Sequence, residues 1–151
     1  MKNQITIQEE DFQKARNEIL KARKESGKTI VFSGSDEINR KILEKEKIDI
    51  LLIKLAHRKD RIKQRDSGFN HVLAKLAKKK GVAIGINLDE IVESRGKTKA
   101  EILARAMQNV KLCNKNKLKM KFIHVKHERN LYDLKSLGLV LGMPTWMTKN
   151  L

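Results

Sequence analysis

The sequence has 151 residues, enough for one folded domain with a hydrophobic core. Hydrophobic residues make up 40% and charged residues 34%, a balance that is too apolar for a disordered chain. It contains no run of about 18 to 20 apolar residues, as a membrane-spanning helix requires. Its single cysteine, Cys113, fits a reducing compartment. We therefore expect a cytoplasmic protein with no membrane partner.

Positive charge dominates the chain and is concentrated in two segments. Lysine and arginine outnumber aspartate and glutamate 34 to 18, which gives a net charge of +16. Residues 54–81 carry ten basic and two acidic residues, or +8, and residues 111–126 carry six lysines and no acid, or +6. Clustered cations are typical of proteins that neutralise nucleic-acid phosphates, because this releases condensed counterions. A lysine-rich composition without such a partner would explain the total charge but not its clustering.

The first third of the chain alternates helical and strand-like patterns. Residues 4–7 (QITI) are a weak strand candidate, and apolar residues then recur at helical spacing through residues 8–25, up to Gly27. Short, continuous apolar runs follow at residues 29–32 and 48–55. Such runs are typical of strands that are buried on both faces.

A helix and a loop are predicted around the second of these strands. Ser35 or Asp36 is a suitable N-cap for a short helix between the two runs. Residues 57–68 are strongly basic and show no periodicity, so they predict a loop. The helix that follows ends at Gly81, with these residues expected to point inward: Val72, Leu73 and Leu76.

The last third continues the alternation. Residues 82–86 and 121–125 predict two further strands. Thr98 and Glu101 have the spacing of a capping box at the start of the longest helix. A final helix is expected over residues 133–141, before Gly142 and Pro144.

This order of elements predicts an α/β fold. Repeated βαβ units with a parallel sheet follow from apolar strands separated by helices. Four clear strands, or five with residues 4–7, are too few for an eight-stranded barrel, which needs over ~200 residues. We expect one domain over residues 1–151 with a shortened or incomplete TIM-like barrel.

The histidines offer only a weak case for a metal site. His124 and His127 follow the last predicted strand, and His57 with Asp60 follows an earlier one. The surrounding lysines and arginines oppose a bound cation, so solvated or RNA-facing histidines are the favoured interpretation. We expect no metal and no catalytic residues.

Asn70 and His71 stand side by side where a helix begins. His71 could act as a general base only with a partner side chain, and no serine, cysteine or carboxylate nearby in the sequence is placed to be that partner. We expect a partly buried His71 bonded to a backbone carbonyl, while Asn70 and Asp66 act as caps. With Gly68, these residues are predicted to form a structural motif that positions the basic loop.

Three segments resemble one known family. They are DSGFNHVLAKLAKKKGVAIGINL (residues 66–88), SRG (94–96) with the helix after it, and YDLKSLGLVLGM (132–143). In this order they are similar to the archaeal ribonuclease P protein component 3 family, the thirty-kilodalton subunit family of the eukaryotic enzyme. The resemblance covers residues 48–143.

The resemblance implies a fold and a function. The fold would be a barrel related to the polymerase and histidinol phosphatase superfamily, shortened at the N-terminus, and without the HxH motif of its metal-dependent members. The function would be that of a ribonuclease P protein subunit, supporting an RNA that removes the 5′ leader from precursor tRNA. Mg²⁺ would lie on the RNA, and the partners would be that RNA, other protein subunits and, indirectly, precursor tRNA. A stand-alone metal-dependent phosphoesterase and a general RNA-binding or ribosome-associated protein remain alternatives.

Specific residues are assigned on charge and composition. Met143, Trp146 and Met147 are predicted at a protein interface, with Trp146 plugging the open barrel as the alternative. The residues predicted to bind RNA are Arg58, Lys59, Arg61, Lys63, Arg65, Lys79, Arg95, Lys97, Lys121 and Lys126.

Overall fold

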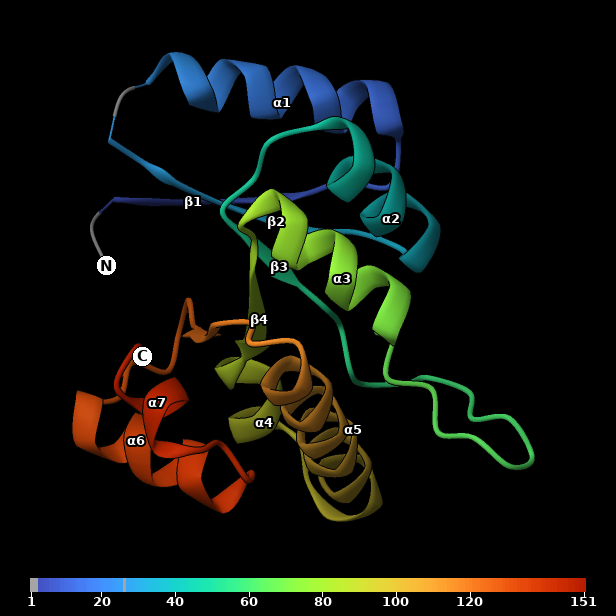
Figure 1. Cartoon of the computed structure of the whole chain (residues 1–151), viewed down its shortest axis with the longest axis vertical. Coiled ribbons are helices and arrows are strands. Elements are labelled where there is room, and N and C mark those ends of the chain that lie inside the picture. The colour runs from blue at the N-terminus through green and yellow to red at the C-terminus, as the bar shows by residue number, and fades with distance from the viewer. Residues whose placement is uncertain (1–2, 26) are drawn as a thin grey trace.

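The computed structural model describes residues 3–25 and 27–151, and it contains a parallel sheet flanked by helices (Figure 1). The strands are β1 (Gln4–Gln8), β2 (Thr29–Ser33), β3 (Ile50–Leu52), β4 (Ala83–Asn87) and β5 (Met120–Ile123). The helices are α1 (Phe12–Lys24), α2 (Asp36–Lys45), α3 (His71–Lys80), α4 (Leu88–Glu93), α5 (Gly96–Lys115), α6 (Leu131–Val140) and α7 (Thr145–Thr148).

The sheet follows the order of the chain. All neighbouring strands are parallel, in the order β1-β2-β3-β4-β5, with β1 and β5 at the two edges. The predicted α/β class and parallel sheet are thus confirmed, including the weak candidate at residues 4–7. The sheet is open, as in part of a TIM-like barrel.

The large core lies on the face of the sheet that the helices cover. Alternate strand residues such as Phe32, Leu51 and Phe122 are fully or almost fully buried there against α1, α2, α3 and α5. The intervening residues point to the other face, where a smaller apolar cluster contains Val31, Ile50, Leu52 and Ile123. Both faces of the central strands are therefore buried, which explains their continuous apolar sequences.

Helix starts were predicted less well than helix faces. α5 begins at Gly96, where the preceding Arg95 makes no side-chain cap, so the predicted Thr98 capping box is wrong: Thr98 lies inside the helix. α1 begins after Asp11, whose carboxylate accepts from the backbone N–H of Lys14 at 2.9 Å. The expected helix over residues 8–25 is correspondingly shorter.

Two other caps match their sequence signals. Ser35 caps α2, and Gly81 ends α3 in the left-handed conformation, with φ +69°. Val72 was expected to point inward in α3 but is 51% exposed, while Leu73 is buried. In the part of the chain that is described, no helix is both long and apolar enough to cross a bilayer.

Candidate nucleic-acid interface

The basic loop, residues 57–68, leaves the carboxyl end of β3 and projects from the body of the protein before α3 begins (Figure 1). Near its tip, the backbone groups of Arg61 and Gln64 exchange two hydrogen bonds, at 2.9 and 3.2 Å. This pairing makes a tight turn with Ile62 and Lys63 at its apex, and the Ile62 side chain is fully exposed. The loop thus has a defined conformation.

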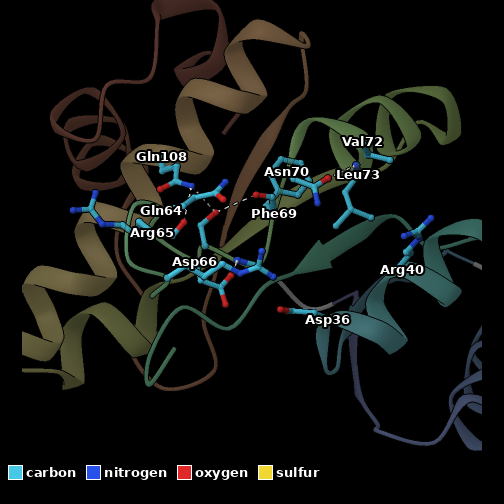
Figure 2. Close-up of a pocket in the computed structure, with 13 residues that line it drawn as sticks. Asp36, Arg40, Gln64, Arg65, Asp66, Phe69, Asn70, Val72, Leu73 and Gln108 are labelled. Carbon is cyan, nitrogen blue, oxygen red and sulfur yellow. Dashed lines mark hydrogen bonds between the residues drawn. The ribbon is translucent and has the colours of Figure 1, made fainter. Parts of the chain in front are cut away.

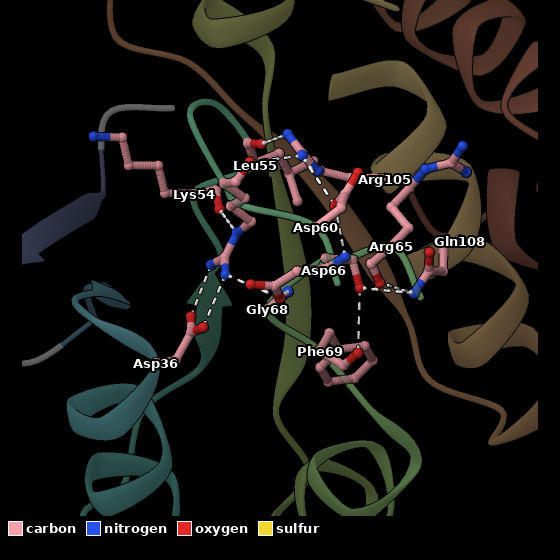
Figure 3. Close-up of polar contacts among 12 residues, drawn as sticks. Asp36, Lys54, Leu55, Asp60, Arg65, Asp66, Gly68, Phe69, Arg105 and Gln108 are labelled. Carbon is pink, nitrogen blue, oxygen red and sulfur yellow. Dashed lines mark hydrogen bonds and ion pairs between the residues drawn. The ribbon is translucent and has the colours of Figure 1, made fainter. Parts of the chain in front are cut away.

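A buried arginine in α5 holds the base of the loop. The guanidinium of Arg105 is only 1% exposed, and it donates to the carbonyls of Leu55 and Arg58, each at 2.9 Å (Figure 3). It also donates to Asp60 Oδ1 at 3.1 Å. Asp60 in turn accepts from the backbone N–H of Asp66 at 2.8 Å. One side chain thereby connects both ends of the loop to the longest helix.

The opposite side of the loop is held by Arg58. Its guanidinium donates to both carboxylate oxygens of Asp36, at 2.7 and 2.8 Å, and lies 3.4 Å from Asp66 (Figure 3). Gly68 has a φ of +69°, and a Cβ at this position would clash with the same guanidinium. Arg58 therefore fixes the loop against α2, and a glycine is required beneath it.

A carboxylate fixes the point where the loop leaves β3. Glu90 in α4 accepts from the backbone N–H groups of Leu55 and Ala56, at 3.1 and 2.7 Å. Together with Arg105, it satisfies the backbone on both sides of this turn. The backbone N–H groups of Leu55 and Ala56 and the carbonyl of Leu55 therefore have hydrogen-bond partners where the chain leaves β3.

Hydrogen bonding shifts the ionisation of these groups in the expected directions. The backbone N–H of Asp66, together with Arg105, lowers the pKa of the Asp60 carboxyl. The hydrogen bonds that the Arg58 guanidinium donates to Asp36 raise its pKa, against the effect of its partial burial. Both residues are thus charged at neutral pH, and the ion pairs persist there.

Asn70 and His71 do not form a dyad. Asn70 caps α3, accepting from the backbone N–H of Leu73 at 3.0 Å, as expected. Asp66 caps a turn instead of a helix, accepting from the N–H of Gly68 at 2.9 Å. His71 was expected to be partly buried, but it is exposed on the surface of the helix. The motif is structural, and His71 is not the residue that locks it.

The predicted RNA-binding residues of the loop fall into two groups. Lys59, Arg61, Lys63 and Arg65 are exposed and, within the described residues, have no carboxylate within 4.0 Å. Arg58 is different, because its side chain is 12% exposed and already paired with two aspartates. Its geometry gives it an anchoring role in place of the phosphate contact expected from sequence.

The remaining predicted RNA-binding residues lie outside the loop, on other elements. Arg95 and Lys97 lie exposed where α5 begins, and Lys126, after β5, pairs with Glu93 at 3.3 Å. Lys79 lies in the last turn of α3, at the end of the helix away from the loop. Lys121 is partly buried and donates to the carbonyl of Asn150, and its desolvation lowers its pKa.

The C-terminal residues assigned to an interface lie mostly in the core. Met143 and Met147 are 3% and 0% exposed, so their assignment to a partner surface is wrong. Trp146 is partly buried against the core, and its indole N–H donates to Asn114 Oδ1 at 3.1 Å. Lys117 lies over its ring, 5.5 Å from the centroid. This arrangement favours the alternative in which Trp146 covers the core.

The histidines are not brought together. His127 Nε2 lies 3.2 Å from Glu93 Oε1, and the backbone N–H of His127 donates to Asp89 Oδ1 at 2.9 Å. Over residues 3–25 and 27–151, no three or more His, Cys, Asp or Glu side chains are grouped as metal ligands would be. The possible combination of His57, Asp60, His124 and His127 is therefore not assembled.

The residues that position the loop were missed in the sequence. Arg105 occurs at helical spacing from the buried Ile102 and Asn109, which is an unusual place for a charge and was the one available signal. Asp36 was considered only as a cap, and Glu90 carried no signal. Their partners lie 22 to 50 residues away and could not be identified from local patterns.

The fold and the loop define an α/β protein with an open, TIM-like parallel sheet and a braced, cationic loop at the carboxyl end of β3. A family model described as RNase P subunit p30 matches residues 2–150, and the chain belongs to this family. The resemblance noted in the sequence is therefore confirmed.

Individual relatives agree with this family. The chain is 37% identical over 111 residues to ribonuclease P protein component 3 of Methanosarcina acetivorans, covering 74% of this chain and 44% of the relative. It is 29% identical over 149 residues to the protein of the same name from Methanocaldococcus jannaschii, covering 96% and 62%. The chain thus spans about half the length of these relatives.

A solved structure has the same fold. It is a chain in a cryo-EM structure of archaeal ribonuclease P with mature tRNA, with a TM-score of 0.76 and 28% identity. The match covers 97% of this chain and 62% of that chain.

Proposed function

We propose that this chain acts as a protein component of ribonuclease P, supporting the catalytic RNA as it removes the 5′ leader from precursor tRNA. Its membership of the RNase P subunit p30 family supports this function, as does the likeness to a chain in archaeal ribonuclease P. The observation that carries the proposal is the basic loop, in which four exposed cations are presented by a braced backbone.

The proposal assigns the chemistry to the RNA. Mg²⁺ would be bound by the RNA subunit, and this chain would supply no catalytic group. Its direct partners would be the ribonuclease P RNA and other protein subunits of the enzyme, with precursor tRNA contacted indirectly. The complex would work in the cytoplasm.

The loop suits the recognition of an RNA backbone. Lys59, Arg61, Lys63 and Arg65 place four positive charges within seven residues, and phosphates are the dominant anions on any RNA surface. Because Arg105 and Arg58 fix the loop from two sides, little conformational entropy is lost when it binds. A rigid cationic loop therefore gains more from each phosphate contact than a flexible tail would.

Binding to ribonuclease P RNA at several salt concentrations tests this function. Replacing Arg61, Lys63 and Arg65 by glutamine should flatten the slope of log affinity against log salt by about two to three, because each phosphate contact contributes roughly 0.7 to 0.9. The matched control removes three exposed charges from α1, far from the loop (Lys14→Gln, Lys21→Gln and Lys24→Gln).

The control should leave the slope nearly unchanged. Equal slopes in the wild type and the loop variant, with both folded, would remove the loop from the RNA interface. Metal-dependent cleavage of precursor tRNA by the protein without RNA, lost in a His124→Ala, His127→Ala variant, would instead favour a stand-alone phosphoesterase.

A further inference from the structure

A cavity of about 570 Å³ opens between the basic loop, α2, α3 and α5 (Figure 2). We propose that it receives a single unpaired nucleotide of a structured RNA, held out of its helix. This inference rests on the proposed function, since it adds the recognised RNA feature to a loop that binds RNA backbone. Cavities of this size accommodate one nucleotide but not a base-paired duplex.

The charge around the cavity suits a nucleotide phosphate. Arg61 and Arg65 line it from the loop, and Arg40 lines it from α2. Two acids also line it, Asp36 and Asp66, and both lie against the guanidinium of Arg58, so that four arginines face two aspartates around this edge. Arg40 is also paired with Glu44 at 2.9 Å, so Arg61 and Arg65, which have no carboxylate within 4.0 Å among the described residues, are the arginines open to a phosphate.

Side-chain amides lie where the edge of a base could be read. Gln108 uses its Nε2 group to donate to Arg65 O and Ser67 Oγ, each at 3.3 Å, which leaves its Oε1 as an acceptor. Asn70 uses Oδ1 to cap α3, which leaves its Nδ2 as a donor. Gln64 adds a third amide from the loop. Amide donors and acceptors of this kind, which line the cavity from three segments, are the groups that recognise the edge of an unpaired base.

An apolar surface completes the cavity. Val72, in the first turn of α3, is 51% exposed and lines it next to the buried Leu73 and Phe69. An exposed valine at this position has no structural need, because the adjacent Leu73 already supplies the core contact. It offers the face of a base a surface from which water is easily displaced.

The ligand that fits is part of a polymer and not a free nucleotide. The cationic surface continues beyond the cavity to Lys59 and Lys63, which do not line it. A free nucleotide would leave these charges without a partner. An RNA with one extruded nucleotide would satisfy the cavity and the charged loop together, through its flanking phosphates.

Two RNA hairpins of equal length distinguish this site from general backbone binding. One is fully paired and the other has a single bulged nucleotide, made with each of the four bases and with 2-aminopurine. The full chain should bind at least one bulged hairpin about tenfold more tightly than the paired one. Binding should also change the fluorescence of the bulged 2-aminopurine.

Two variants test whether the cavity causes the tighter binding of the bulged hairpin. The double variant Gln64→Ala, Val72→Ala should reduce the preference for the bulged hairpin to less than about threefold, while the affinity for the paired hairpin stays the same. Lys63→Gln, at the loop tip outside the cavity, should weaken both RNAs equally. Equal binding of all hairpins by the wild type would overturn the cavity proposal and leave the proposed function standing. If neither hairpins nor ribonuclease P RNA bind, the proposed function fails as well.

Discussion

The guanidinium of Arg105 reaches Asp60 across 45 residues of sequence, with Nη2 3.1 Å from Oδ1. Arg105 is buried, whereas Asp60 lies at the surface and is partly exposed. This pair couples the cationic loop to the core, so the stability of the fold and the presentation of the loop depend on the same side chain.

Arg105→Ala should lower the free energy of unfolding by about 3 kcal/mol. The change leaves the carbonyls of Leu55 and Arg58 unpaired and opens a cavity under the loop. Urea denaturation measures the loss. Lys111→Ala, at an exposed position of the same helix, should stay within about 0.5 kcal/mol of the wild type. A loss equally small for Arg105→Ala would mean that the loop is not held from α5.

Gly68→Ala and Gly81→Ala form a matched pair, because both glycines have a φ of +69°. Each alanine is strained by the backbone, at about 1 kcal/mol. Only at Gly68 does the new Cβ also meet Arg58, since no other described residue beyond its chain neighbours lies within 4 Å of a Cβ at Gly81. Gly68→Ala should therefore destabilise by at least about 1 kcal/mol more than Gly81→Ala in denaturant titrations. Equal losses would show that Arg58 can move aside freely.

Asp89 should make the fold sensitive to acid. Partial burial raises the pKa of Asp89, but the backbone N–H groups of Val125, His127 and Lys126 outweigh it and hold the pKa below its usual value. The unfolded state therefore binds the proton more readily. This contribution to stability is complete above the unfolded pKa of about 3.9 and is lost as pH falls through the lower folded value.

Unfolding measurements from pH 6 down to pH 2.5 test this effect. Asp89→Asn should be less stable than the wild type by about 1 to 2 kcal/mol at pH 6, and the difference should shrink as the pH falls below 4. Other carboxylates lose stability in both proteins, so only the difference between them is informative. A difference that stays constant with pH would contradict the role of Asp89 as a charged acceptor.

Trp146→Ala should destabilise the fold by about 2 to 3 kcal/mol, because its partly buried ring packs on the core and its N–H is bonded to Asn114. Trp146→Phe keeps most of the packing and should lose about 1 kcal/mol. The exposed Tyr132, 81% accessible on α6, gives the control: Tyr132→Ala should change stability by less than about 0.5 kcal/mol. An unchanged melting temperature for Trp146→Ala would restore its assignment to an interface.

The sequence was sufficient to predict the helices and strands whose apolar residues recur at a regular spacing or form a continuous run. Ile84 and Ile86 are buried in the strand predicted over residues 82–86, and the α5 residues Ile102, Ala106 and Val110, which recur at helical spacing, are buried as well. These signals are local, so they can be recognised without knowing what the residues contact.

Only part of the site could be predicted from the sequence, because some of its features depend on contacts that are not local. The charge of the loop is a local property, and it was found. The brace formed by Arg105, Asp36 and Glu90 depends on contacts between distant segments, and nothing near these residues identifies their partners. Arg58 was therefore placed among the phosphate contacts, because its sequence neighbourhood does not distinguish it from Arg61.

The order of the strands has a consequence for how the protein acquires its structure. Each strand from β2 to β5 pairs with the strand that precedes it in the chain. During synthesis, every newly emerged strand and helix therefore meets a neighbour that is already available, and no strand must wait for a later one to fill a gap beside it. The sheet can grow in the direction of translation, and the loop brace, which needs Arg105, is completed only after α5 has left the ribosome.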